Sequence, residues 1–173
     1  MNHKRQFIIS FGGLKIGNHR FNFEIDDQFF EPLDYSEIRH GKLSVELLLD
    51  RQSQLLHFKF DIKGTVEVTC DRCLGQFSIP INGSNVLFVK FGKEYSEESH
   101  ELVVIPETQT QINLMHYVYE FITLLVPYRH VHPGDDNSAT GCDPAVIRKL
   151  IDLSSNHKPD PRWDDLKKLK SNK

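Results

Sequence analysis

Hydrophobic and polar residues alternate along most of the first hundred positions, a pattern typical of strands that bury one face. Six segments alternate in this way: residues 21–25, 45–49, 58–62, 66–68, 77–81 and 87–91. Glycines such as Gly64 and Gly83 separate several of them and indicate turns. The pattern therefore predicts short strands in an antiparallel sheet or a partly closed barrel.

The period of the pattern changes after residue 108. Apolar residues recur at intervals of three and four over residues 112–126, which predicts one long helix that packs on the sheet and ends at Pro127. Asp143-Pro144 and Asp160-Pro161 each place a capping residue before a proline, the signal of a helix start. We therefore expect an α+β fold with short C-terminal helices. Residues 1–108 form its β-rich part and 109–173 its helical part, in one continuous domain.

Composition narrows the possible environments and partners. The chain has 173 residues with a net charge of −3, which excludes a uniformly basic surface of the kind that coats nucleic acids. No stretch approaches the roughly 20 apolar residues of a membrane-spanning helix. The three cysteines do not form the even-numbered set of a disulfide framework. These features predict a cytoplasmic protein without a membrane partner.

A pair of closely spaced cysteines is the sharpest local feature. Cys70 and Cys73 lie between two predicted strands, so a hairpin tip can direct both thiolates at one metal ion. A structural zinc site needs four ligands. Cys142 is the candidate third ligand, and His132 is the candidate fourth, with His130 as the alternative. Zinc is thus the one cofactor that the sequence predicts.

Enzymatic chemistry is not expected. The sequence contains no phosphate-binding glycine loop and no nucleophile elbow. A thiol enzyme that uses Cys70 and Cys73 is the remaining catalytic alternative. Redox cysteines of that kind open a helix, however, and no helical pattern follows Cys73.

Positive charge is concentrated at both ends of the chain: residues 1–20 contain Lys4, Arg5, Lys15 and Arg20 without an acidic residue, and residues 158–173 contain six Lys or Arg against three Asp. Arg162, Lys167, Lys168 and Lys170 can attract phosphates, and Trp163 can stack on an unpaired base. The same residues also fit a solvent-exposed tail in which Trp163 docks on protein. Both interpretations stay open at this point.

Three motifs together resemble the YceD family, the large ribosomal RNA accumulation proteins. The first is the Cys-x-Arg-Cys-Leu signature at residues 70–74, and the second is a helix that ends in Leu-x-Pro at residues 125–127. The third is an Asp-Pro segment that continues to Leu-Lys, at residues 160–170. Many family members carry paired cysteines after the Leu-x-Pro helix, where this chain has only His130, His132 and Cys142.

The resemblance implies a non-enzymatic ribosome-biogenesis factor that is needed for accumulation or processing of large-subunit ribosomal RNA. Its partner would be ribosomal RNA or the pre-ribosomal large subunit, with a large-subunit ribosomal protein as a further candidate. Arg72 and the basic segment match family motifs and are the predicted contact residues. Arg72 can clamp a phosphate or pair with a carboxylate. The alternative is a protein-interaction module that docks through its C-terminal helix and affects RNA indirectly.

Overall fold

The computed structural model describes residues 6–33, 35–133 and 141–155. The predicted helix at residues 162–170 lies outside the described residues, and so do Arg162, Trp163, Lys167, Lys168 and Lys170. The chain divides into two compact units. Met1–Thr69 and Gln76–His130 form the first, here named the sheet unit. Cys70–Gly75 and Val131–Lys173 form the second, here named the cysteine unit.

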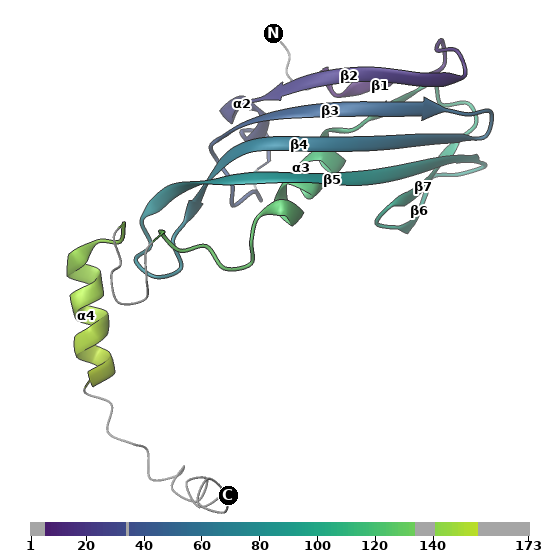
Figure 1. The fold of residues 1–173 in the computed structure, drawn as a ribbon. Coiled ribbons are helices and arrows are strands. Elements are labelled where there is room, and N and C mark those ends of the chain that lie inside the picture. The colour runs from purple at the N-terminus through teal and green to yellow at the C-terminus, as the bar shows by residue number, and fades with distance from the viewer. Residues whose placement is uncertain (1–5, 34, 134–140, 156–173) are drawn as a thin grey trace, which may run out of the picture. The chain divides into compact units, whose positions relative to one another are not determined.

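An open six-stranded sheet is the scaffold of the sheet unit (Figure 1). Its strands, in spatial order, are β2 (Gly17–Ile25), β3 (Gly41–Arg51), β4 (Leu55–Thr69), β5 (Gln76–Gly92), β7 (Leu102–Pro106) and β6 (Ser96–Ser99). Neighbours pair antiparallel except β5 and β7, which run parallel. A second, two-stranded sheet pairs β1 (Ile8–Ser10) with β8 (Gln111–Asn113). Because β2 and β6 are edge strands that do not pair with each other, the sheet is not the partly closed barrel that the sequence had left open.

The helix that packs on the sheet is shorter than the sequence predicts. Helix α3 (Met115–Leu125) has 11 residues, so the expectation of one long helix over residues 112–126 is wrong. Ile112 belongs to β8 instead, where it pairs with Ile9. An apolar residue three positions before a helix fits the helical period and a short strand equally well, so the pattern could not separate the two. At the other end Val126 is extended, as expected before Pro127.

Two glycines that indicated turns lie inside long strands. Strand β4 continues through Gly64 and strand β5 through Gly83, so segments predicted as separate strands are continuous. Gly64 has a φ of +152°, and a Cβ there would lie 2.2 Å from the carbonyl oxygen of Lys42. A Cβ on Gly83 would lie 2.2 Å from a methyl carbon of Leu125 in α3. Glycine therefore serves close approach at both positions and does not reverse the chain.

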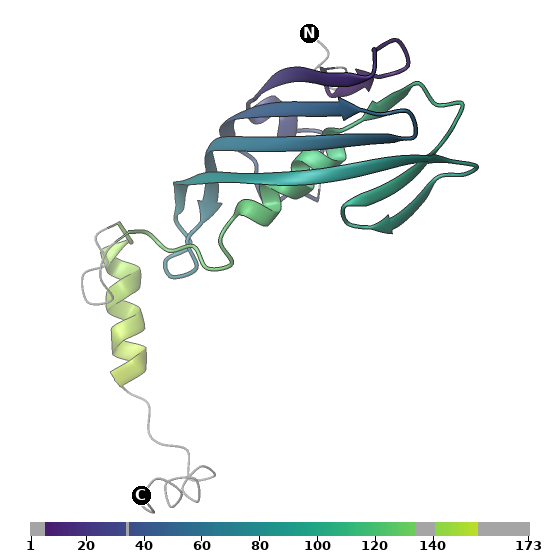
Figure 2. The ribbon, with the colours of Figure 1, turned by 45° about the vertical axis from the view of Figure 1, so that its right-hand side comes forward.

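The core of the sheet unit lies between the sheet and the short helices. Helix α3 crosses one face of the sheet (Figure 2), and its Phe121 ring packs edge-on against Phe60 of β4 at 5.0 Å between centroids. Helix α2 (Asp27–Phe30) contributes the buried rings of Phe29 and Phe30. Its N-cap is Asp26, which accepts a hydrogen bond from the backbone N–H of Gln28. Alternating β-strand residues and the buried aromatic and aliphatic side chains of α2 and α3 thus build one continuous apolar layer.

The cysteine unit contains helix α4 (Pro144–Ser155) and the loop that joins β4 to β5. The Asp143 carboxylate accepts a hydrogen bond of 2.8 Å from the backbone N–H of Ala145, which confirms the predicted helix start at Asp143-Pro144. In the part of the chain that the structure describes, no helix has both the length and the apolar character needed to cross a bilayer.

Candidate metal centre

The loop that carries the first two cysteines is a tight turn held by backbone hydrogen bonds. The Cys70 N–H donates to the Gly75 carbonyl, and the Leu74 N–H donates to the Cys70 carbonyl, both at 2.9 Å. Leu74 adopts a φ of 60°, which completes the turn without a glycine at that position. The loop follows strand β4 directly and precedes strand β5, as predicted for a hairpin tip. It contains no helix, so the dipole that activates redox cysteines is absent from this loop.

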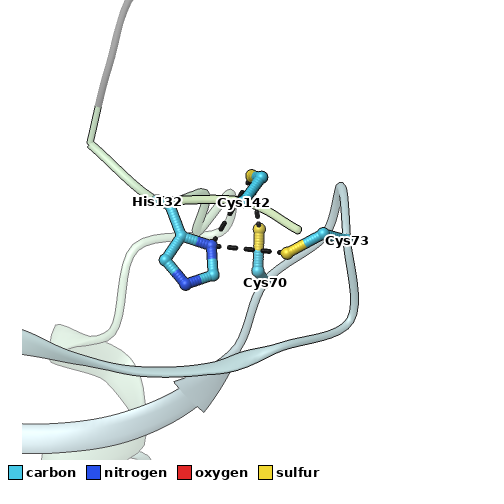
Figure 3. A group of neighbouring side chains, drawn as sticks. All are labelled: Cys70, Cys73, His132 and Cys142. Atoms are coloured by element: carbon cyan, nitrogen blue, oxygen red, sulfur yellow. Dashed lines mark hydrogen bonds between the residues drawn. The ribbon is translucent and has the colours of Figure 1, made fainter. Parts of the chain in front are cut away.

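Four candidate ligands converge within the cysteine unit (Figure 3). Cys70 and Cys73 come from the loop, while His132 and Cys142 come from the segment before α4. The four ligand atoms, three Sγ and one imidazole nitrogen, all lie within 4.8 Å of one another. All three cysteines are free and buried.

The spacing of these atoms fits a tetrahedral zinc ion. With Zn–S bonds of about 2.3 Å and Zn–N bonds of about 2.0–2.1 Å, a tetrahedron requires about 3.8 Å between sulfurs and about 3.6 Å from sulfur to nitrogen. The Sγ atoms of Cys70 and Cys142 are 3.9 Å apart. His132 Nδ1 lies 3.5 Å from the Sγ of Cys73 and 3.6 Å from that of Cys142. Three sulfurs and one imidazole form a donor set that zinc prefers.

The surroundings of Cys70 and Cys142 shift their pKa values in opposite directions. Burial acts to raise the pKa of Cys70, but hydrogen bonds from the backbone N–H groups of Cys73, Arg72 and His132 outweigh it and lower that pKa to about 6. Burial and the neighbouring thiols Cys73 and Cys70 raise the pKa of Cys142 to about 11. A deprotonated Cys142 therefore requires a nearby positive charge at neutral pH, which a divalent cation would supply.

Close packing behind the histidine explains a glycine that the sequence analysis missed. A Cβ on Gly141 would lie 2.8 Å from the Cβ of His132 and 3.0 Å from a carbon of its ring. The glycine therefore lets the chain pass directly behind the imidazole. The only sequence signal was its position next to Cys142, and glycines occur beside many residues without such a reason.

The structure distinguishes between the two candidate histidines. His130 lies outside the cluster, where its Nδ1–H donates to the carbonyl oxygen of Thr69 at 2.7 Å. His132 directs its Nδ1 at the thiols. The structure brings all four predicted ligands together, and the fourth of them is His132, not His130.

Arg72 contributes to the loop through its backbone. Its N–H donates to the Sγ of Cys70 at 3.4 Å, a contact that stabilises a thiolate. Its side chain is half-buried, and its predicted contact with a phosphate or a carboxylate stays a prediction. The other predicted contact residues, Arg162, Trp163 and the three lysines, lie outside the described residues.

A comparison with known families identifies the group to which this site belongs. Residues 58–170 match the family described as large ribosomal RNA subunit accumulation protein YceD. The chain belongs to the YceD family. The match contains both halves of the Cys3His cluster and helix α4, whereas strands β1 to β3 precede it. Searches of curated proteins and of solved structures found no significant match.

Proposed function

We propose that the protein is a non-enzymatic ribosome-biogenesis factor that binds ribosomal RNA or the pre-ribosomal large subunit. In this proposal, a zinc ion on Cys70, Cys73, His132 and Cys142 organises the part of the chain that makes the contact. The observation that carries the proposal is a four-ligand cluster with tetrahedral spacing inside the region that matches a ribosomal RNA accumulation family.

The ligand set supports a structural and not a catalytic metal. Catalytic zinc is held by three protein ligands and keeps a fourth position for water or substrate. Here four protein ligand atoms lie within 4.8 Å of one another, enough to complete the coordination of one ion, and three of the four residues are buried. Bound zinc would supply a cross-link between the loop Cys70–Gly75 and the segment that begins at Val131. That role requires no reaction at the metal.

The distribution of charge favours the C-terminal end of the cysteine unit as the RNA-binding segment. The described residues of the sheet unit carry 10 Lys or Arg against 15 Asp or Glu, so a polyanion is repelled there. Residues 156–173 carry 6 Lys or Arg against 3 Asp. The zinc cluster lies in the same unit as this basic segment.

The zinc proposal is tested by elemental analysis of the untagged protein after purification with zinc present. We expect about one zinc per chain, and we expect His132→Asn to lose it. The matched control is His130→Asn, which removes a neighbouring imidazole that lies outside the cluster and should keep the metal. Equal zinc content in the two variants, or none in the native protein, would contradict the site.

The RNA proposal is tested by crosslinking in growing cells, with the crosslinked RNA sequenced. We expect large-subunit ribosomal RNA, and a strong loss when Lys167, Lys168 and Lys170 are changed to glutamine. The same change at Lys42, Lys63 and Lys90 of the sheet removes equal charge and should have little effect. In vitro, the plot of log affinity against log salt concentration should become shallower by roughly 2 to 3 in slope for the first triple variant, at about 0.7–0.9 per lost phosphate contact. Crosslinks to protein alone would favour the interaction-module alternative.

A further inference from the structure

Helix α4 exposes an apolar stripe to water. Leu150, Ile151 and Leu153 are 43%, 59% and 64% exposed. By helical spacing they share a side with Ile147, while Arg148, Lys149 and Asp152 lie on the opposite side.

The exposed stripe is unfavourable for an isolated helix of this length. Helix α4 has 12 residues, and helices this short are marginally stable in water without an apolar face packed against a neighbour. The candidate metal cluster can fix only its beginning, since Cys142 precedes the first turn. A second element is therefore needed to cover Leu150 and its neighbours.

We propose that residues 161–170 of the same chain form that element, packed antiparallel on α4. Three apolar residues, Trp163, Leu166 and Leu169, recur there at a spacing of three, and Asp160-Pro161 is a helix-start signal. Only residues 156–160 separate this segment from the end of α4. Five residues lie within the usual range for a connection between antiparallel helices.

The spacing of the apolar residues in α4 and in residues 161–170 favours this segment over a second copy or a separate protein as the element that covers α4. Leu153 and Trp163 each lie 5 residues from Lys158, the middle of the connection. Leu150 and Leu166 each lie 8 residues from it. Ile147 and Leu169 each lie 11 residues from it. Because both helices rise 1.5 Å per residue, an antiparallel hairpin places each pair at the same level. A second copy or a separate partner imposes no such symmetry on this sequence.

The same register sets the levels of four cations. Arg148 and Lys168 lie 10 residues from Lys158, and Lys149 and Lys167 lie 9 residues from it. The hairpin thus places four cations at two adjacent levels outside the apolar seam, on outward faces that phosphates can reach. This consequence rests on the proposed RNA function, whereas the docking itself does not.

Trp163 is the only tryptophan of the chain, so its fluorescence reports the docking directly. In the full-length, zinc-loaded protein without RNA, we expect blue-shifted emission that iodide quenches poorly. Leu150→Asp should shift the emission to that of exposed tryptophan. The control Asp152→Asn alters the opposite side of α4 and should change nothing. Emission of exposed tryptophan in the native protein would overturn the proposal, and it would leave the RNA proposal standing.

Paired cysteines test the register even if Leu150→Asp melts α4. Leu150→Cys with Leu166→Cys should form a disulfide within one chain under mild oxidation, as shown by mass spectrometry of peptides from the zinc-loaded protein. The mismatched pair, Leu153→Cys with Leu169→Cys, is displaced by about 9 Å along the helices and should not. Disulfides between two chains would place a second copy on the stripe, and equal crosslinking of both pairs would exclude a fixed register. Either result overturns the proposal.

Discussion

The sheet unit and the cysteine unit are stabilised by different means. The sheet unit buries a continuous layer of side chains from its strands and from α2 and α3. Among the described residues of the cysteine unit, the buried ones are Cys70, Cys73 and Cys142. The first unit therefore has an apolar core, whereas the described part of the second has a set of candidate ligands in the place of one. A segment without a core of its own folds only if another interaction, such as a metal, holds it.

Metal removal should produce the largest difference between the units. We expect chelation, or Cys142→Ser, to abolish the hydrogen-exchange protection of α4 while β4 and β5 remain protected. The reason is that structural zinc contributes about 10–16 kcal/mol in small zinc-dependent peptides, and the described residues of the cysteine unit include no buried apolar cluster to replace it. Adding zinc back to the chelated native protein should restore protection. Equal protection of α4 with and without metal would contradict the claim that the two units are stabilised by different means.

Truncation of a core side chain should destabilise the sheet unit and leave the metal site of the cysteine unit intact. Phe60→Ala removes a fully buried ring that packs on Phe121, and we expect the free energy of unfolding of the sheet unit to fall by about 3–5 kcal/mol. Urea denaturation followed by near-ultraviolet circular dichroism measures this. Lys63→Ala, on an exposed position of the same strand, should change it by less than about 0.5 kcal/mol. The zinc content of this variant in native buffer should stay at one per chain. Loss of zinc would show that the metal site depends on the core of the sheet unit, contrary to the proposal.

A smaller effect is expected from the glycine behind the histidine. Gly141→Ala places a methyl group 2.8 Å from the Cβ of His132, so the imidazole must shift. We expect zinc affinity to fall by about 10–100-fold, the usual effect of disturbing a residue that positions a ligand. Competition with a zinc-binding dye measures it. Gly13→Ala, where an added Cβ meets no atom within 4 Å, should leave affinity unchanged. Equal affinities for both variants would contradict this packing role.

The smallest effect concerns an exposed pair in the sheet unit. The His40 ring nitrogen lies 2.9 Å from the Asp27 carboxylate. That hydrogen bond lowers the pKa of Asp27 and raises the pKa of His40. The Asp27 contribution is lost as pH falls through its lowered pKa, and the His40 contribution is lost as pH rises through its raised pKa.

The pair should therefore stabilise the sheet unit most between about pH 4 and pH 6.5, the ordinary pKa values of the two groups. We expect His40→Gln to lower the melting temperature slightly at pH 5.5 and to leave it unchanged at pH 9. A variant whose melting temperature differs from the native one equally at both pH values would show that the ion pair contributes nothing.

Local signals in the sequence predicted the elements of the site. Cys70-x-x-Cys73 between two alternating segments predicted a loop with two convergent thiols, and the structure shows that loop. Asp143-Pro144 predicted the start of α4, since capping depends only on neighbouring residues. The choice of His132 over His130 could not be made in this way. It depends on the Thr69 carbonyl, which is 61 residues away from His130 in the sequence.

The architecture depended on contacts that no local pattern contains. Gly64 and Gly83 resembled turn residues because their reason, the close approach of Lys42 and Leu125, lies far away in the chain. The parallel pairing of β5 with β7 leaves the same alternation as an antiparallel pairing. Such patterns fix which residues are buried better than they fix which strands are neighbours.

The sequence separation of the ligands sets an order of events during synthesis. Cys142 follows Cys70 by 72 residues, so at 5–20 residues per second a ribosome takes roughly 4–14 s to add the last ligand after the first. Strands β4 and β5 are complete within that interval and can already have closed the loop that carries the first two thiols. In the nascent chain, the loop with its two cysteines can therefore bind zinc early. The two remaining ligands would complete the site as translation proceeds.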